Sequence, residues 1–264
     1  MDYIRRKFSE LYAVQLAEKS TTRYGTYNFS DDEIIRYTTV KYRPGLIQKS
    51  ADYAVVYHAD RDVIGIYFQG SSDIGDWSAN ATTTTKSWGT VKYNGKKFTL
   101  KIHKGWLTMY SAMQKAIHKE YEALRKEHPT ADLEISGHSL GAGQAQLCAV
   151  DIYRTYGDKC HCFTFGSVKP FYVGNNASIK AYIQSCCHEV YNFCDTSDMV
   201  CYLPPFDGFD HINAVWISYA DSGLNYKIEN IFSYHFVYDI EKLYEDIEIY
   251  KDGVPTLDTN KVTY

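Results

Sequence analysis

The fold of this chain is indicated by one stretch, Ile135-Ser136-Gly137-His138-Ser139-Leu140-Gly141-Ala142-Gly143. It places a G-x-S-x-G pentapeptide between a short apolar strand and a helix rich in small residues, which is the setting that this motif requires. A sharp turn there lifts a serine hydroxyl above the edge of a sheet, and the two glycines let the strand and the helix approach without side-chain clashes. The stretch therefore predicts Ser139 as a nucleophile, and a plain glycine-rich turn is the alternative.

Strand-like and helix-like segments alternate on both sides of this turn. Apolar residues three and four positions apart predict a helix over 106–128, which Pro129 ends, and a second helix over 140–156, which Gly157 closes. The other predicted elements are helices at 3–18 and 234–250, hairpins at 51–69 and 92–102, short strands at 133–135, 162–165 and 190–193, and a polar loop after residue 18. This alternation predicts a single α/β domain over residues 1–264, with a mostly parallel sheet covered by helices on both faces.

Composition excludes several classes of protein. The 28 basic and 32 acidic side chains give a formal charge of -4, which offers no field for a phosphate backbone, so nucleic acid is not an expected partner. No stretch reaches the roughly 18 uninterrupted apolar residues of a membrane-spanning helix. The first residues show no apolar leader with a small-residue cleavage site, which predicts a cytoplasmic protein.

The cysteines predict thiols rather than a disulfide framework. Their number, seven, is odd, and no secretion leader is apparent. Cys160-His161-Cys162 resembles half of a metal site, but no second ligand pair lies at a zinc-like spacing, and Cys162 begins an apolar strand. We therefore expect a buried strand here, no metal and no organic cofactor.

A serine nucleophile needs a base to take its proton and a carboxylate to orient that base. In this fold the chain order is serine, then acid, then histidine, and the acid lies just beyond a strand. Asp195 and Asp198 both follow the predicted strand at 190–193, and the histidine after either of them is His211 or His235. The residue pattern alone leaves both pairs open.

The oxyanion of the reaction needs two backbone N–H donors. One comes from the residue after the nucleophile, Leu140, and the other from an earlier turn between a strand and a loop. The strand that ends in Gln69-Gly70-Ser71 has the right character for this second donor, because its glycine allows close approach of the backbone.

Taken together, these segments resemble the class 3 lipases, the fungal triacylglycerol lipase family, over roughly residues 50 to 240. Five blocks carry the resemblance, and they occur in the same order. They are YFQGSSDIGDW (67–77), IHKGW (102–106), GHSLG (137–141), FTFG (163–166) with VGN (173–175), and DMV (198–200) with LPP (203–205).

The resemblance implies an α/β-hydrolase fold with a catalytic triad. Ser139 would be the nucleophile, Asp198 the acid, because it heads the D-x-V block, and His235 the general base. Ser71 and Leu140 would supply the oxyanion hole. His211 resembles the structural histidine that precedes a tryptophan strand in this family.

The resemblance also implies a lid loop over about residues 72–88, in which Ile74 and Trp77 would contact the acyl chain. The run 81–86, ATTTTK, is polar for a surface that faces lipid when open, and a solvated loop is the alternative. Gln69 stands where the family usually has arginine, and the spacer at 167–172 is longer than usual. Both departures bear on the choice of substrate rather than on the triad.

The expected function is therefore hydrolysis of a carboxylic ester, most simply of a lipid, through an acyl-enzyme, with transient contact to a lipid interface. A carboxylesterase or phospholipase that acts on more polar esters is the alternative within enzymes. A catalytically inactive lipid-binding protein is the alternative outside them.

Overall fold

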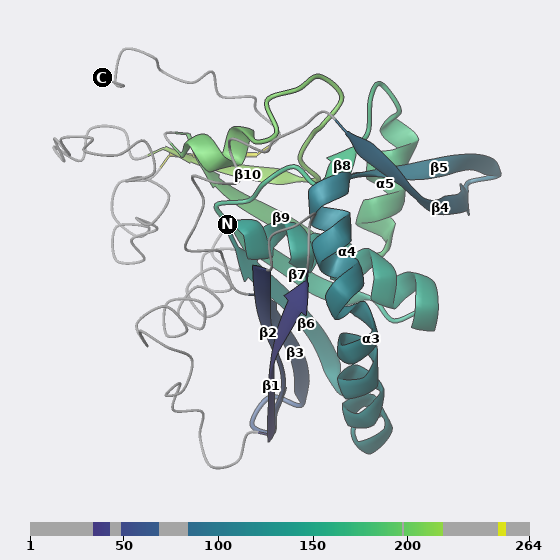
Figure 1. Cartoon of the computed structure of the whole chain (residues 1–264), viewed down its shortest axis with the longest axis vertical. Helices are drawn as coiled ribbons and strands as arrows, with labels where there is room; N and C mark the ends of the chain where they lie inside the picture. Colours follow the sequence, from purple (N-terminus) through teal and green to yellow (C-terminus); the bar gives the residue numbers. More distant parts are fainter. Residues whose placement is uncertain (1–33, 43–48, 69–83, 197, 219–247, 252–264) are drawn as a thin grey trace, which may run out of the picture.

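The computed structural model describes residues 34–42, 49–68, 84–196, 198–218 and 248–251, and Figure 1 shows the whole chain. Most of the described strands form one sheet of eight, in the order β1-β2-β3-β6-β7-β9-β10-β11. They are β1 (Ile34–Tyr42), β2 (Lys49–His58), β3 (Val63–Phe68), β6 (Asp132–His138), β7 (Cys160–Phe165), β9 (Cys187–Asp195), β10 (Ala214–Ser218) and β11 (Glu248–Lys251).

The centre of this sheet is parallel and its two ends are antiparallel. Strands β3, β6, β7, β9 and β10 run parallel, whereas β1 and β2 at one end and β11 at the other pair antiparallel with their neighbours. Every residue of β3 is buried, so both faces of this strand are covered. A buried parallel strand accordingly has a continuous apolar sequence rather than an alternating one. The predicted α/β fold with a mostly parallel sheet is confirmed.

Three described helices pack around the sheet. They are α3 (Lys104–Glu127), α4 (Leu140–Tyr156) and α5 (Ala177–Ser185). Figure 1 shows α3 and α4 beside one another along the sheet. The predicted ends of these two helices are accurate, because Pro129 and the left-handed Gly157, at φ +79°, stop them. No described helix is long and apolar enough to cross a membrane.

A smaller sheet contains β4 (Thr85–Tyr93), β5 (Lys96–His103) and β8 (Phe171–Tyr172). The turn between β4 and β5 has Asn94 at φ +48° and Gly95 at φ +76°, the conformation that a two-residue hairpin turn demands. The predicted hairpin at 92–102 is thus confirmed, although it begins earlier. Residues 85–88, predicted as the end of the lid loop, are part of β4 instead.

Two other predicted elements differ from the structure. The predicted polar loop after residue 18 contains β1, which pairs along its full length with β2. The predicted helix at 234–250 ends in residues of β11, where pairing with β10 overrides the helical pattern. The rest of that segment and the predicted helix at 3–18 lie outside the described residues.

Candidate active site

The backbone turns sharply at Ser139, between β6 and α4. Ser139 has φ +60° and ψ -124°, a conformation that residues with side chains rarely adopt and that is found where the surrounding structure imposes it. Its N–H donates to the carbonyl of Phe165, at 2.9 Å, and its own carbonyl accepts from the N–H of Ala142, at 3.0 Å. These two bonds join the turn to the end of β7 and to the first turn of α4.

Glycines allow this turn because strand and helix backbones nearly touch. A Cβ atom on Gly137 would lie less than 3.0 Å from the backbone of Gly141, and one on Gly143 would lie less than 3.0 Å from the ring of Trp106. Leu140 is the first residue of α4, where backbone N–H groups lack acceptors within the helix and the helix dipole favours negative charge. The turn therefore has the backbone features that an oxyanion site uses.

The two candidate acids lie at the same edge of the sheet as Ser139. Strands β6, β7 and β9 are parallel, so their carboxyl ends, which lead to Ser139, Phe165 and Asp195, meet at one edge. Asp195 is the last residue of β9 and Asp198 follows it, with the N–H of Asp198 donating to the carbonyl of Asp195 at 3.1 Å. Both carboxylates are buried.

Asp198 is held by donors to both of its oxygens. Oδ1 accepts from the N–H of Val200 at 2.9 Å, so that Asp198 caps the short 3-10 helix η1 (Met199–Tyr202). Oδ2 accepts from Sγ of Cys201 at 3.4 Å. These contacts fix the orientation of a carboxylate that has no exposure to solvent.

His211 is buried among structural contacts beside this turn. Its Nε2 donates to the carbonyl of Cys201, at 2.7 Å, and its ring lies edge-on to Trp216. Sγ of Cys194 lies 3.7 Å from Nε2. Burial opposes both charged forms, but the neighbouring Cys201 side chain and the imidazole of His211 lower the pKa of Cys194 to about 6. Cys194 in turn raises the pKa of His211.

His235, predicted as the general base, lies outside the described residues. The chain that contains it, residues 219–247, is nevertheless joined to described strands at both ends. β10 is parallel to β9 and ends at Ser218, which pairs with Glu248 at the start of β11. Both ends of this segment are therefore attached at the edge that also bears Ser139 and Asp198.

Ser71, the predicted second oxyanion donor, also lies outside the described residues, as do Ile74 and Trp77 of the predicted lid. The strand before them ends at Phe68, which pairs with Gly137 in β6. The segment with Ser71 thus leaves the sheet beside the glycine that precedes the nucleophile turn.

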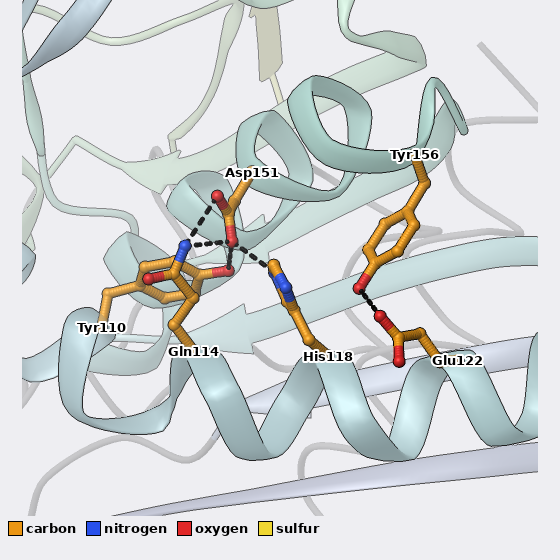
Figure 2. A network of polar contacts seen from close by, with 6 residues as sticks. All are labelled: Tyr110, Gln114, His118, Glu122, Asp151 and Tyr156. Carbon is orange, nitrogen blue, oxygen red and sulfur yellow. Dashed lines mark hydrogen bonds and ion pairs between the residues drawn. The ribbon is translucent and has the colours of Figure 1, made fainter.

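A polar network between α3 and α4 was not predicted from the sequence. Asp151 of α4 accepts hydrogen bonds from Tyr110 (2.8 Å), Gln114 (2.9 and 3.0 Å) and His118 (2.7 Å), as Figure 2 shows. Burial opposes the charged carboxylate, but these donors outweigh it and lower the pKa of Asp151. The spacing of four residues between the donors on α3 was the signal that could have revealed them, since such residues share one helix face. The network holds the helix that starts at the nucleophile.

The described residues contain no group of three His, Cys, Asp or Glu side chains that could hold a metal ion. Cys160 and Cys162 lie buried in β7, as the strand interpretation predicted. All seven cysteines are buried, and none of them forms a disulfide bond.

Comparisons with known proteins identify relatives of this chain. A family profile described as Lipase (class 3) matches residues 65–208. A lipase of Rhizomucor miehei is 34% identical over 102 residues, which cover 38% of this chain and 26% of that protein. The secreted mono- and diacylglycerol lipase A of Penicillium camembertii is 27% identical over 195 residues, which cover 73% of this chain and 56% of that protein. The matches thus span about half or less of these relatives.

Solved structures of fungal lipases share the fold. Rhizomucor miehei triacylglyceride lipase superposes with a TM-score of 0.52 at 27% identity, over 63% of this chain and 61% of that one. Lipase II of Rhizopus niveus gives a TM-score of 0.66 over 83% of this chain and 82% of its own, and at 18% identity it supports the fold alone.

The prediction of a cytoplasmic location is contradicted by the Penicillium relatives, which are named as secreted lipases. That prediction rested on the first residues, in which no apolar leader with a small-residue cleavage site is seen. Because the family profile covers more than half of the residues and includes the serine turn and the DMV and LPP blocks, the chain belongs to the class 3 lipase family.

Proposed function

We propose that this chain hydrolyses carboxylic esters of lipids, with Ser139 as nucleophile, Asp198 as the acid and His235 as the general base. The strained turn at Ser139 carries the proposal, because its φ of +60° is imposed on a residue with a side chain at the carboxyl edge of the sheet. Asp198 lies at that edge, and the segment with His235 is attached there at both ends.

The mechanism is acyl transfer in two steps. His235 takes the proton of the Ser139 hydroxyl as the oxygen attacks the ester carbonyl, and it returns the proton to the leaving alcohol. Asp198 keeps the imidazole in the tautomer that accepts this proton. Water then attacks the acyl-enzyme by the same route and releases the carboxylic acid.

The negative charge that develops on the carbonyl oxygen is stabilised by the backbone N–H groups of Leu140 and Ser71. Leu140 opens α4, so the helix dipole adds to the direct hydrogen bond. No metal ion is needed for these steps.

Neutral glycerides are the proposed substrates. The relatives include a triacylglyceride lipase and a mono- and diacylglycerol lipase, and the second of these is named as secreted. We accordingly expect this chain to act outside the cell. We also propose that residues 1–264 form one α/β domain. Ile74 and Trp77, in the segment after β3, would contact the acyl chain at a lid.

Among the alternatives, a carboxylesterase or phospholipase is favoured by the threonine run at 82–85, which is polar for the surface of a lipid-facing lid. Hydrolysis rates for a soluble short-chain ester and for an emulsified triacylglycerol separate the two functions. A rate that rises sharply when the substrate passes its solubility limit supports the lipase. A rate that follows the dissolved ester alone supports the carboxylesterase.

Asp195 and His211 are the alternatives within the triad. The Nε2 of His211 already donates to the Cys201 carbonyl, which favours a structural role for this ring. His211→Asn should therefore reduce stability more than it reduces turnover, whereas His235→Asn should abolish turnover and leave the fold intact.

The experiment that tests the proposed function compares Ser139→Ala with the unmodified chain on a soluble ester. Turnover should fall by roughly 10⁴-fold or more, as in other enzymes whose triad nucleophile is removed. A circular dichroism melt checks that the variant is folded. Turnover close to that of the unmodified chain would reject the proposal.

A further inference from the structure

The hairpin of β4 and β5 carries an unusual concentration of positive charge. Residues 85–104 contain six lysines and no acidic residue, and no aspartate or glutamate occurs anywhere from 77 to 119. The whole chain has a formal charge of -4, so the rest of it carries -10 against +6 on this segment. Figure 1 shows the two strands extending away from the layers of the main sheet and its helices.

Half of these lysines share one face of the hairpin. Side chains alternate along a strand, so Lys97, Thr99 and Lys101 of β5 point to the same side. Their cross-strand partners in β4, which lie on that side as well, are Lys92, Thr90 and Ser87. All six side chains are exposed. We refer to these six residues as the lysine face.

The lysine face is electrostatically unbalanced within the described part of the chain. Lys92 and Lys97 lie directly opposite each other, and like charges in that position destabilise a strand pair. None of its three lysines forms an ion pair with a described residue. The ammonium of Lys101 lies 5.9 Å from the ring centroid of Tyr172 in β8, a half-buried aromatic that extends the same surface. An anionic layer on this face would relieve the repulsion.

The base of the hairpin lies next to the nucleophile turn. β5 ends at His103, whose ring packs on Trp106 at 4.3 Å. Trp106 in turn occupies the space beside Gly143 in the first turn of α4. A surface bound to the hairpin would therefore lie close to the edge of the sheet that carries Ser139.

We propose that the lysine face docks this protein on an anionic lipid surface. The ammonium groups bind phosphate or carboxylate oxygens of the headgroups, and the hydroxyls of Ser87, Thr90 and Thr99 donate hydrogen bonds between them. The charge of -10 on the rest of the chain turns this face, rather than another, towards a negative surface. The same negative charge disfavours binding of a nucleic acid, because a nucleic acid would contact the negatively charged rest of the protein as well as the three lysines of the hairpin. The proposal goes beyond ester hydrolysis and does not depend on which residues form the triad.

The test uses the full chain with Ser139→Ala, so that the lipid stays intact, and measures co-flotation with vesicles. Vesicles of phosphatidylcholine alone are compared with vesicles in which phosphatidylglycerol replaces part of it. The protein should bind only the second kind, and added salt should release it. Replacing Lys92, Lys97 and Lys101 together by glutamine should lower the partition coefficient about 100-fold, since each lysine near an anionic surface contributes about a five-fold gain.

The matched control replaces Lys115, Lys119 and Lys126 by glutamine, because these exposed lysines of α3 change the net charge equally. This variant should bind as the parent does. Equal losses in both triple variants, equal binding to both kinds of vesicle, or binding of a DNA duplex without binding of the anionic vesicles would overturn the proposal.

Hydrolysis of a soluble ester, measured in the same lysine variants with Ser139 restored, should not change. This readout separates the two proposals. Vesicle binding without ester hydrolysis would reject the proposed function and leave the docking surface standing, and the reverse result would reject the docking surface alone.

Discussion

The turn at Ser139 and the turn at Asp198 lie at one edge of the same sheet but are held by different kinds of contact. The first is held by backbone packing, because a Cβ on Gly137 would come within 3.0 Å of the Gly141 backbone. The second is held by polar side chains, through the bonds of Asp198 with the Val200 N–H and the Cys201 thiol. The nucleophile turn therefore tolerates no added atoms, whereas the acid turn can be weakened in steps.

The largest effect is expected at the acid. Asp198→Asn keeps the shape of the side chain but can no longer hold the imidazole in its accepting tautomer, and kcat should fall by about 10⁴-fold. The matched control is Asp195→Asn, a buried carboxylate three residues away. Turnover on a soluble ester checks both variants. A larger loss for Asp195→Asn would move the role of the acid to that residue.

The next effect tests the backbone packing of the nucleophile turn. Gly137→Ala forces a Cβ against the Gly141 backbone and should lower the free energy of unfolding by about 3 kcal/mol. Gly157→Ala is the control, because an added Cβ there would meet open space and only the φ of +79° would be strained. It should lower the free energy of unfolding by only about 1 kcal/mol. Urea unfolding measures both. Equal costs would mean that close packing does not determine this turn.

A moderate effect on stability is expected at Asp151, which holds α4 to α3 at a point far from the Ser139 turn. Asp151→Asn weakens the bonds from Tyr110, Gln114 and His118 and should lower the free energy of unfolding by about 2 kcal/mol (Figure 2). The control is Glu122→Gln, which alters one exposed bond to Tyr156 and should lower it by less than about 0.5 kcal/mol. Urea unfolding at several pH values measures both.

The pH dependence of this effect has a definite sign. The pKa of Asp151 is lowered in the folded protein, so the stabilisation is complete above the ordinary carboxyl pKa of about 3.9 and is lost as pH falls through the lowered value. Asp151→Asn should remove that part of the acid-induced loss of stability. An unchanged acid limb in the variant would contradict this role of Asp151.

The smallest effect concerns the thiol beside the acid. Cys201→Ala removes one donor to Asp198 and should lower kcat about five-fold, which corresponds to about 1 kcal/mol. Cys186→Ala is the control, because this thiol donates instead to the carbonyl of Tyr182 at the end of α5. If both variants keep full turnover, the Cys201 thiol does not position the acid.

The same contrast explains how much of the site could be predicted from the sequence. The nucleophile turn was predicted because its determinants, Gly137, Ser139 and Gly141, are adjacent in the chain and their spacing is a backbone requirement. The hairpin at Asn94-Gly95 was predicted for the same reason. Both are local features that need no knowledge of distant contacts.

The contacts of the acid turn could not be predicted, because they join residues that only the folded sheet brings together. The carbonyl of Cys201 meets His211 ten residues later, and Asp151 meets donors 33 to 41 residues earlier. β1 was missed although its sequence, IIRYTTVKY, is rich in the β-branched and aromatic residues that favour strands, and the structure pairs it with β2 along its full length. His235 was named by family resemblance, and its position lies outside the described residues.

The most direct test of Ser139 as the nucleophile is covalent labelling with an organophosphonate ester, followed by peptide mapping by mass spectrometry. The reagent should add one phosphonyl group to the peptide that contains Ser139, and neither Ser139→Ala nor the heat-unfolded chain should be labelled. An intact, folded chain that takes up no label, or a label that persists in Ser139→Ala, would contradict the assignment and favour a lipid-binding protein without catalysis.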